Sequence, residues 1–137
     1  MLKVYCDGAC SKNPGVGSWA YIGVQNNKQI ACAYGIVEYT TNNRMELQAV
    51  INAMRLFNNC VVVVDSLYVH DGITKWIKSW KRNKWKTSSG PVKNLELWQE
   101  LDQLMEGKDI VWEWQRSHVN NDHDIVDALA HYVLYGY

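Results

Sequence analysis

The sequence predicts an α/β fold, a mixed five-stranded sheet flanked by helices. Strand-like segments come first, at about 2–9, 17–25 and 29–37, and Asn26-Asn27-Lys28 between the last two is typical of a hairpin turn. Helical and strand-like segments then alternate to the end of the chain. Strands joined by a tight turn pair antiparallel, whereas parallel strands need a longer crossover such as a helix. We therefore expect three antiparallel strands followed by parallel ones.

The elements after the hairpin follow from local patterns. Residues 40–43 offer helix-capping side chains, and apolar residues follow at helical spacing over 45–57. Residues 61–64 are four valines in a row, which is typical of a central strand covered on both faces. The remaining elements expected are a helix at 67–73, another helix or its continuation at 76–80, an irregular excursion at 85–93, a helix capped by Asn94 and reaching about 106, a strand at 109–114, a loop at 117–123 and a last helix at 124–134.

The composition indicates one globular domain spanning residues 1–137, with 47% apolar and 20% charged residues. No apolar run is long enough to cross a membrane, and strand-like sequence begins at Leu2, which leaves no room for a signal peptide. We therefore expect a soluble, cytoplasmic protein that does not bind membranes. The four cysteines are expected to be reduced and mostly buried, although a disulfide between the first two is an alternative that a cytosolic setting disfavours: Cys6, Cys10, Cys32 and Cys60.

The net charge of zero hides one strongly basic segment. Seven of the 14 basic residues lie from Lys75 to Lys93, where there is no acidic residue. The rest of the chain is correspondingly acidic, with seven basic and 14 acidic side chains. A domain with this separation of charge is expected to hold an anionic partner near bound cations.

Four acidic residues are candidates for one shared site: Asp7, Glu46, Asp65 and Asp127. Asp7 precedes a glycine near the end of the first strand, where an aspartate is most often a turn residue. Asp65 lies between the valine run and a helix, so it can be an N-cap, a ligand at the end of a buried strand, or both. Glu46 lies on the apolar face of its helix and needs a partner or a metal there. For Asp127 taken alone, the helix dipole is a sufficient explanation.

Taken together, the four residues indicate a metal site. Clustered carboxylates repel one another and raise one another's pKa, so their assembly alone gives no stability. Two strand ends and two helices packed on the same edge of a sheet can bring all four together. Because Mg²⁺ prefers a few carboxylates together with water and phosphate oxygens, the sequence predicts a divalent cation site suited to phosphoryl chemistry.

These residues lie in motifs that resemble type 1 ribonuclease H. Residues 40–47 read TTNNRMEL, which resembles a motif of that family, and residues 6–10 with 13–15, and 65–66 with 68–69, resemble its other two active-site segments. The basic segment resembles the family's protrusion, called the handle, placed here at about 75–93. Residues 112–114, 117–118 and 127–130 resemble its last strand, its histidine loop and its last helix. The resemblance covers essentially the whole chain and implies a single catalytic domain with the ribonuclease H-like fold.

The resemblance implies endonucleolytic hydrolysis of the RNA strand of RNA–DNA hybrids, which leaves 3′-hydroxyl and 5′-phosphate ends. The four carboxylates would bind two Mg²⁺ ions, for which Mn²⁺ is expected to substitute. One ion would activate the attacking water, and the other would stabilise the leaving 3′ oxygen. His118 would shuttle protons and help the product leave, a role that follows chiefly from the resemblance, because a lone histidine before a helix is more often structural. The expected partner is the hybrid, bound by a monomer.

The resemblance also implies contacts to the substrate. Handle cations, Lys81 and Lys84 among them, would neutralise phosphates of the DNA strand. Trp76, Trp80 and Trp85 either pack on sugars and bases or seat the segment on the core; we expect a mixture, with at least one of them lining a DNA channel. The positions that match minor-groove, DNA-phosphate or 2′-hydroxyl contacts are Cys10, Asn13, Thr41, Asn42 and Asn43, with Glu46 also reading the 2′-hydroxyl.

Two segments depart from the family pattern. Leu67 stands where a glutamine is common, which removes one polar contact to the RNA strand. Residues 117–127 read SHVNNDHDIVD against the family form GHxGxxxNExAD, so the glycines are missing and Asp124 replaces a glutamate. We expect these departures to affect the reach of His118 and the rate of product release.

Two alternatives to a hybrid nuclease remain. A catalytically idle hybrid-binding module would keep the fold, but it gains nothing from four mutually repelling carboxylates. A relative of the same fold that acts on another polynucleotide, such as a strand-transfer enzyme, is disfavoured by the handle and by TTNNRMEL.

Overall fold

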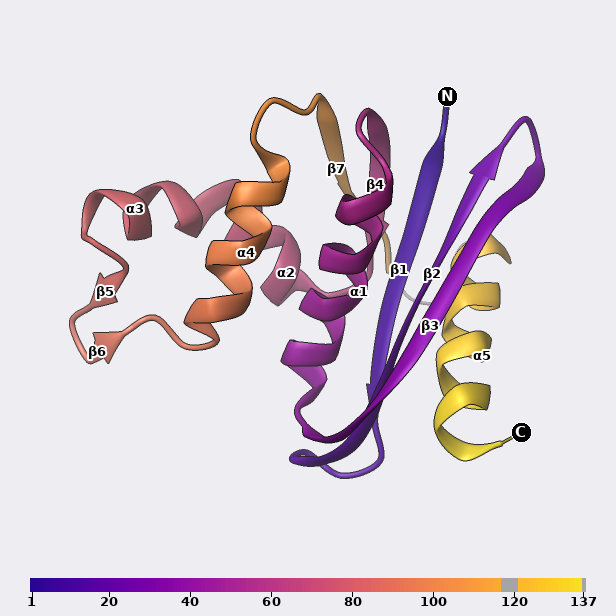
Figure 1. The fold of residues 1–137 in the computed structure, drawn as a ribbon, viewed down its shortest axis with the longest axis horizontal. Helices are drawn as coiled ribbons and strands as arrows, with labels where there is room; N and C mark the ends of the chain where they lie inside the picture. Colours follow the sequence, from indigo (N-terminus) through magenta and orange to yellow (C-terminus); the bar gives the residue numbers. More distant parts are fainter. Residues whose placement is uncertain (117–120, 137) are drawn as a thin grey trace.

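The computed structural model of the chain describes residues 1–116 and 121–136 (Figure 1). Its elements, in chain order, are β1 (Lys3–Cys10), β2 (Gly15–Gln25), β3 (Lys28–Thr40), α1 (Asn42–Leu56), β4 (Cys60–Val64), α2 (Leu67–Asp71), the π-helical segment η1 (Gly72–Trp76), α3 (Ile77–Arg82), β5 (Lys86–Thr87), β6 (Gly90–Pro91), α4 (Leu95–Met105), β7 (Ile110–Trp114) and α5 (Asn121–Tyr135).

The main sheet has the strand order β3-β2-β1-β4-β7. β1, β2 and β3 pair antiparallel, whereas β4 pairs parallel with both β1 and β7. The predicted fold class is therefore confirmed. The hairpin between β2 and β3 turns through Asn26 and Asn27, whose φ angles of 53° and 61° are those of a tight turn compatible with the twist of the sheet.

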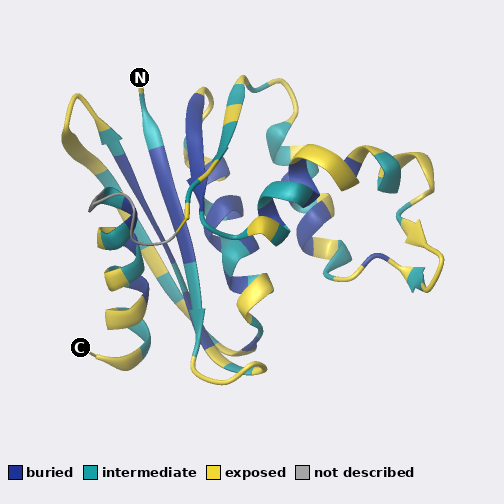
Figure 2. Ribbon diagram, turned by 180° about the vertical axis from the view of Figure 1, so that it is seen from behind, coloured by how far each residue is buried: buried dark blue, intermediate teal, exposed yellow. Residues whose placement is uncertain are grey.

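Helices cover the two faces of the sheet (Figure 1). On one face, Val62 and Val64 belong to a large core with α1 and α4. On the other face, Val61 and Val63 pack with residues of α5. The valine run is thus buried on both sides, as the sequence predicts for a central strand. Figure 2 shows the contrast between this buried centre and the largely exposed segment from α3 to β6, which extends away from the sheet.

α1 begins three residues before the predicted start because Thr41 caps it: the Thr41 hydroxyl accepts a hydrogen bond of 3.2 Å from the Arg44 N–H. α4 begins where the sequence predicts, directly after Asn94, but the Asn94 side chain does not cap it as expected. Asn94 occupies the cap position, but its side chain makes no capping hydrogen bond and its φ angle is 59°. Its amide donates instead to the Tyr68 hydroxyl and accepts from Arg44, so Asn94 ties three segments together.

The chain from 67 to 82 is helical throughout, with α2, η1 and α3 following one another directly. Of the two predicted alternatives for 76–80, the structure therefore shows the continuation of the preceding helix and not a separate helix. Gly72 lies at the start of η1, where a Cβ atom would be 2.1 Å from the ring of Trp98. Its missing side chain lets Trp98 pack against the backbone, which anchors the base of the handle on α4.

The last helix starts earlier than predicted. α5 begins at Asn121, so His123 lies in its first turn and not in a loop, and Asp127 lies in its second turn. Asp122 and Asp124 stand in the first turn, where their charges favour the positive end of the helix dipole, and this explains the earlier start. The remaining part of the predicted loop, 117–120, lies outside the described residues.

All four cysteines are free. Cys6 and Cys60 are buried, Cys10 is half-buried and Cys32 is exposed, so the expected burial holds for two of the four. Cys6 and Cys10 both lie in β1, and four strand residues span about 13 Å, which is too far for a disulfide. In the part of the chain that the structure describes, no helix has the length and apolar character to cross a membrane.

Candidate active site

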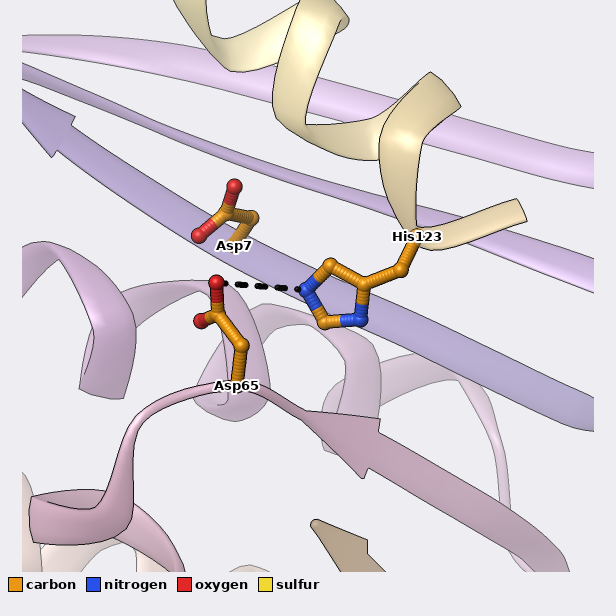
Figure 3. Close-up of side chains that lie close together, drawn as sticks. All are labelled: Asp7, Asp65 and His123. Atoms are coloured by element: carbon orange, nitrogen blue, oxygen red, sulfur yellow. Dashed lines mark ion pairs between the residues drawn. The ribbon is translucent and has the colours of Figure 1, made fainter. Parts of the chain in front are cut away.

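The register of two parallel strands brings Asp7 and Asp65 together. β1 pairs with β4 up to Cys6 and Val64; Asp7 is the next residue of β1, and Asp65 directly follows β4. Figure 3 shows their carboxyl groups side by side, with His123 of α5 facing them. Asp7 is only 2% exposed. The indole N–H of Trp114 on β7 donates to the Asp65 carbonyl at 2.9 Å, which holds the chain where it leaves β4.

Gly8 allows Glu46 to join this pair. A Cβ atom on Gly8 would lie 2.5 Å from the Met45 carbonyl carbon and 2.6 Å from the Glu46 nitrogen. Only a glycine lets the first turn of α1 approach β1 this closely. Glu46 shares its helical face with the fully buried Val50 and Ala53, as the apolar stripe predicts.

The pKa values show that the four carboxylates interact. Burial raises the pKa of Asp7 strongly, and the nearby charge of Glu46 raises it further, with Asp127 and Asp65 adding to the effect. Burial likewise raises the pKa of Glu46, to about 8, and the charges of Asp65 and Asp127 contribute. Hydrogen bonds with Asp7 and the Gly8 backbone partly oppose this shift. The structure therefore brings Asp7, Glu46, Asp65 and Asp127 into one cluster, called the carboxylate cluster below.

This cluster has the character of a cation site. Among the described residues, no hydrogen-bond donor other than a carboxyl group reaches the buried oxygens Asp7 Oδ2 and Glu46 Oε2. Negative charge that is buried without donors is unfavourable unless protons or metal ions neutralise it. The donor set, oxygen atoms of several carboxylates at one edge of a sheet, fits a hard divalent cation.

His123 belongs to this site, and the sequence analysis did not select it. Its side chain is 1% exposed, and its Nε2 lies 3.7 Å from Asp65 Oδ2. One ligand atom each from Asp7, Asp65 and His123 lie within 4.8 Å of one another. The signal that could have found it is the spacing from Asp127, four residues later on the same helical face. Assigning His123 to a loop concealed that spacing. His118, which the sequence analysis did select, lies outside the described residues.

A second group of polar residues lies beside the start of α1. The structure gathers three of the predicted substrate positions around one pocket of about 350 Å³, called the polar pocket below; its lining residues are Asn13, Thr41, Asn43, Lys93 and Asn94. The Asn42 N–H donates to Asn13 Oδ1 at 3.1 Å, which fixes the loop after β1 against the helix. The Cys10 thiol donates to the Thr40 carbonyl at 3.5 Å.

The tryptophans of the handle have different environments. Trp80 packs on the fully buried Trp98, with ring centroids 5.1 Å apart, and Trp85 packs on Trp80 at 6.4 Å. Trp80 and Trp85 therefore seat the handle on the core. Trp76 packs on Trp80 at 6.0 Å and on Tyr68 at 6.1 Å, and it is 38% exposed. Contact of Trp76 with nucleic acid stays a prediction.

The two predicted handle lysines also differ. Lys81 Nζ lies 3.3 Å from the Asp102 carboxylate on α4, so an acid outside the basic segment partly balances its charge. Lys84 is exposed, in the left-handed turn where its φ angle is 55°. Leu67, which departs from the family pattern, is 54% exposed at the start of α2.

Comparison with known proteins decides the family. The family model described as RNase H matches residues 1–134. The chain belongs to the ribonuclease H family. A Ribonuclease H of Ehrlichia chaffeensis is 50% identical over 125 residues, which cover 88% of this chain and 84% of that protein. Family membership identifies the chain as an enzyme, a metal-dependent nuclease with its acidic residues clustered as described above.

Solved structures agree with this assignment. LC9-RNase H1, described as a type 1 RNase H with the type 2 active-site motif, aligns with a TM-score of 0.79 at 30% identity, over 98% of this chain and 72% of that one. LC11-RNase H1, solved in complex with an RNA/DNA hybrid, aligns with a TM-score of 0.77 over 98% of this chain and 96% of that one. At 14% identity, the second likeness establishes the fold alone.

Proposed function

We propose that this ribonuclease H hydrolyses the RNA strand of RNA–DNA hybrids at the carboxylate cluster with two Mg²⁺ ions, leaving 3′-hydroxyl and 5′-phosphate ends. The observation that carries the proposal is the pair of buried carboxylate oxygens, on Asp7 and Glu46, that no donor other than a carboxyl group reaches among the described residues. The family assignment supports the same reaction.

Asp7, Glu46, Asp65 and Asp127 would hold the ions. Mg²⁺ bound there would supply an activated water and would neutralise the charge that develops on the leaving oxygen. The protein's own part is positioning: the β1–β4 register fixes Asp7 against Asp65, and Gly8 holds Glu46 beside them. Because these positions are set by the backbone before substrate arrives, little reorganisation is needed during the reaction.

The polar pocket and the handle would bind the hybrid. The pocket offers neutral amide and hydroxyl groups together with one cation, Lys93, a combination that suits a backbone phosphate. The handle adds exposed cations for a salt-sensitive contribution that does not depend on sequence. Contacts to 2′-hydroxyl groups from Cys10, Asn43 and Glu46 would select RNA for cleavage. LC11-RNase H1, a protein of the same fold, was solved in complex with an RNA/DNA hybrid, which supports this part of the proposal.

His118 remains a candidate for proton shuttling and product release. For His118→Ala we expect slower turnover at nearly unchanged hybrid affinity, measured by steady-state and single-turnover kinetics. A loss of affinity without a change in turnover would contradict the role. We further propose that residues 1–137 act as one catalytic domain and a monomer, which sedimentation tests. We also expect the protein to act in the cytoplasm. The matched relative comes from a bacterium, and in bacteria DNA and RNA–DNA hybrids lie in the cytoplasm.

The proposal is tested by incubating labelled RNA–DNA hybrid, duplex RNA and duplex DNA with the protein and Mg²⁺. We expect cleavage of the hybrid alone, and its loss in Asp65→Asn. Asp109→Asn is the matched control, because it removes the same charge at an exposed position before β7. If the wild type leaves the hybrid intact, or if Asp65→Asn cleaves as fast as wild type, the proposed reaction is wrong. Hybrid binding without cleavage would identify the idle hybrid-binding module instead.

A further inference from the structure

We propose that His123 is a nitrogen ligand of the cation held by Asp7 and Asp65, so that this centre has a mixed carboxylate–imidazole donor set and prefers Mn²⁺ to Mg²⁺ more strongly than carboxylates alone would. The inference rests on the proposed function, because it concerns the same cation site. It adds a fifth residue to the centre and assigns it a metal preference.

The distances fit a shared ion. Two atoms that each lie about 2.1 Å from one octahedral cation are separated by about 3.0 Å at adjacent positions and about 4.2 Å at opposite ones. His123 Nε2 and Asp65 Oδ2 are 3.7 Å apart, between these limits. The corresponding atoms of Asp7, Asp65 and His123 all lie within 4.8 Å of one another, so a small contraction brings the three onto one ion. Figure 3 shows the imidazole directed at the Asp65 carboxylate.

The imidazole is held by the core and not by the surface. His123 is 1% exposed, and its ring lies edge-on to Tyr5 of β1, with ring centroids 6.1 Å apart. α5 is itself fixed to the sheet: Val126 and Ala130 are fully buried, and the Ser18 hydroxyl of β2 donates to the Ala130 carbonyl at 2.6 Å. A ligand whose orientation is fixed in this way loses little conformational freedom when a metal binds.

The chemistry of the donor atom gives the preference. Carboxylate and water oxygens suit Mg²⁺, whereas imidazole nitrogen suits first-row transition metals. In the family form GHxGxxxNExAD, an asparagine stands at the position that His123 occupies before Asp124. A substitution of His123 by asparagine therefore removes the nitrogen ligand while keeping a polar side chain of smaller size.

The direct test is pulsed electron paramagnetic resonance of the protein loaded with Mn²⁺ alone. A nitrogen bound to Mn²⁺ produces ¹⁴N modulation of the spin echo. We expect this modulation in the wild type and its loss in His123→Asn. The modulation should persist in two control variants. His118→Asn tests the other histidine assigned to the site. His131→Asn removes an exposed histidine of α5, the ring of which packs on Tyr135.

Calorimetric titration gives an independent readout. We expect His123→Asn to weaken Mn²⁺ binding about tenfold and Mg²⁺ binding less than about threefold. His123→Gln serves as a second variant if His123→Asn melts at a much lower temperature. A wild-type spectrum without ¹⁴N modulation, or equal loss of affinity for both metals, would overturn the inference. The wild-type spectrum needs no variant, and hybrid cleavage with Mg²⁺ is scored separately, so failure here leaves the proposed reaction standing.

Discussion

The carboxylate cluster and the handle are held in opposite ways. The cluster is positioned by the backbone, through the β1–β4 register and the close approach of α1 at Gly8. The handle is positioned by side chains: the ring of Trp80 packs on Trp98, and the rings of Trp76 and Trp85 pack on Trp80. The carboxylates of the cluster are buried or half-buried and repel one another, whereas the cations of the handle are exposed.

This difference separates two tasks. Chemistry on a phosphodiester needs atoms fixed within a fraction of an ångström, which backbone geometry provides. Binding a long duplex through phosphate contacts tolerates adjustable side chains, because each contact is electrostatic and contributes only a part of the affinity. Substitutions should therefore act steeply in the cluster and gradually in the handle.

The largest effect is expected for Gly8→Ala. The added methyl group meets the Met45 and Glu46 backbone, which cannot rotate away, so α1 must shift. We predict a loss of about 1–3 kcal/mol in the free energy of unfolding and at least a hundredfold slower hybrid cleavage. Denaturant titration and single-turnover cleavage measure the two. Gly23→Ala is the control, since its new methyl group meets mainly side chains of Phe57 and Ala31. Equal activity of the two variants would show that Gly8 does not position the cluster.

The next effect distinguishes two neighbouring tryptophans of the handle, Trp80 and Trp76. Trp80→Ala opens a cavity against the buried Trp98, and we predict a loss of about 3 kcal/mol in stability. Trp76→Ala truncates a partly exposed ring, so stability should change by less than about 1 kcal/mol while hybrid affinity falls. Thermal melting and fluorescence anisotropy with labelled hybrid measure these quantities. If Trp76→Ala leaves affinity unchanged, no stacking contact is made there.

The cluster should also make the metal-free protein sensitive to pH. The pKa of Glu46 is raised from 4.5 to about 8 in the folded protein, so folding favours its protonated form. Stability is therefore full below pH 4.5 and falls as the pH rises towards 8, because the folded state must then give up protons that the unfolded state has already lost. The raised pKa of Asp7 acts in the same direction.

We predict that urea titrations without metal show a decline of more than about 1 kcal/mol across this window. Glu46→Gln should flatten the decline, and added Mg²⁺ should restore stability at pH 8 by binding the folded state. A stability that rises between pH 5 and pH 8 without metal would mean that the carboxylates do not interact as described.

The smallest effect concerns the two handle lysines. Replacing both Lys81 and Lys84 by alanine should weaken hybrid binding and reduce the slope of log affinity against log salt by about 0.7–0.9 for each phosphate that is no longer neutralised. Lys84→Ala should contribute more, since Asp102 already partners Lys81. Asp102→Asn should release Lys81 and modestly strengthen binding. If the salt slope of the double variant equals that of wild type, neither lysine contacts a phosphate.

How much of the fold and the site can be predicted from the sequence depends on the range of the interactions. The valine run, the hairpin asparagines and the TTNNRMEL segment carry local signals, and these predicted the sheet and the positions of Asp7, Glu46 and Asp65. His123 was missed because its role depends on a helix boundary, and the sequence analysis assigned Asp122, an acid suited to the first turn of a helix, to the preceding loop. The pairing of Lys81 with Asp102 joins two segments that meet only in the folded chain. The capping role predicted for the Asn94 side chain was wrong for the same reason: its hydrogen-bond partners, Tyr68 and Arg44, are distant in sequence.

The carboxylate cluster is proposed to cleave the RNA strand of an RNA–DNA hybrid. The most direct measurement uses an RNA–DNA hybrid with a different fluorophore on each strand, incubated with the protein and Mg²⁺, with the product ends identified by mass spectrometry. We predict that only the RNA strand is cut, that its fragments carry 3′-hydroxyl and 5′-phosphate ends, and that chelation of the metal stops the reaction. Cleavage of the DNA strand, 2′,3′-cyclic phosphate ends, or undiminished cleavage after chelation would contradict this account.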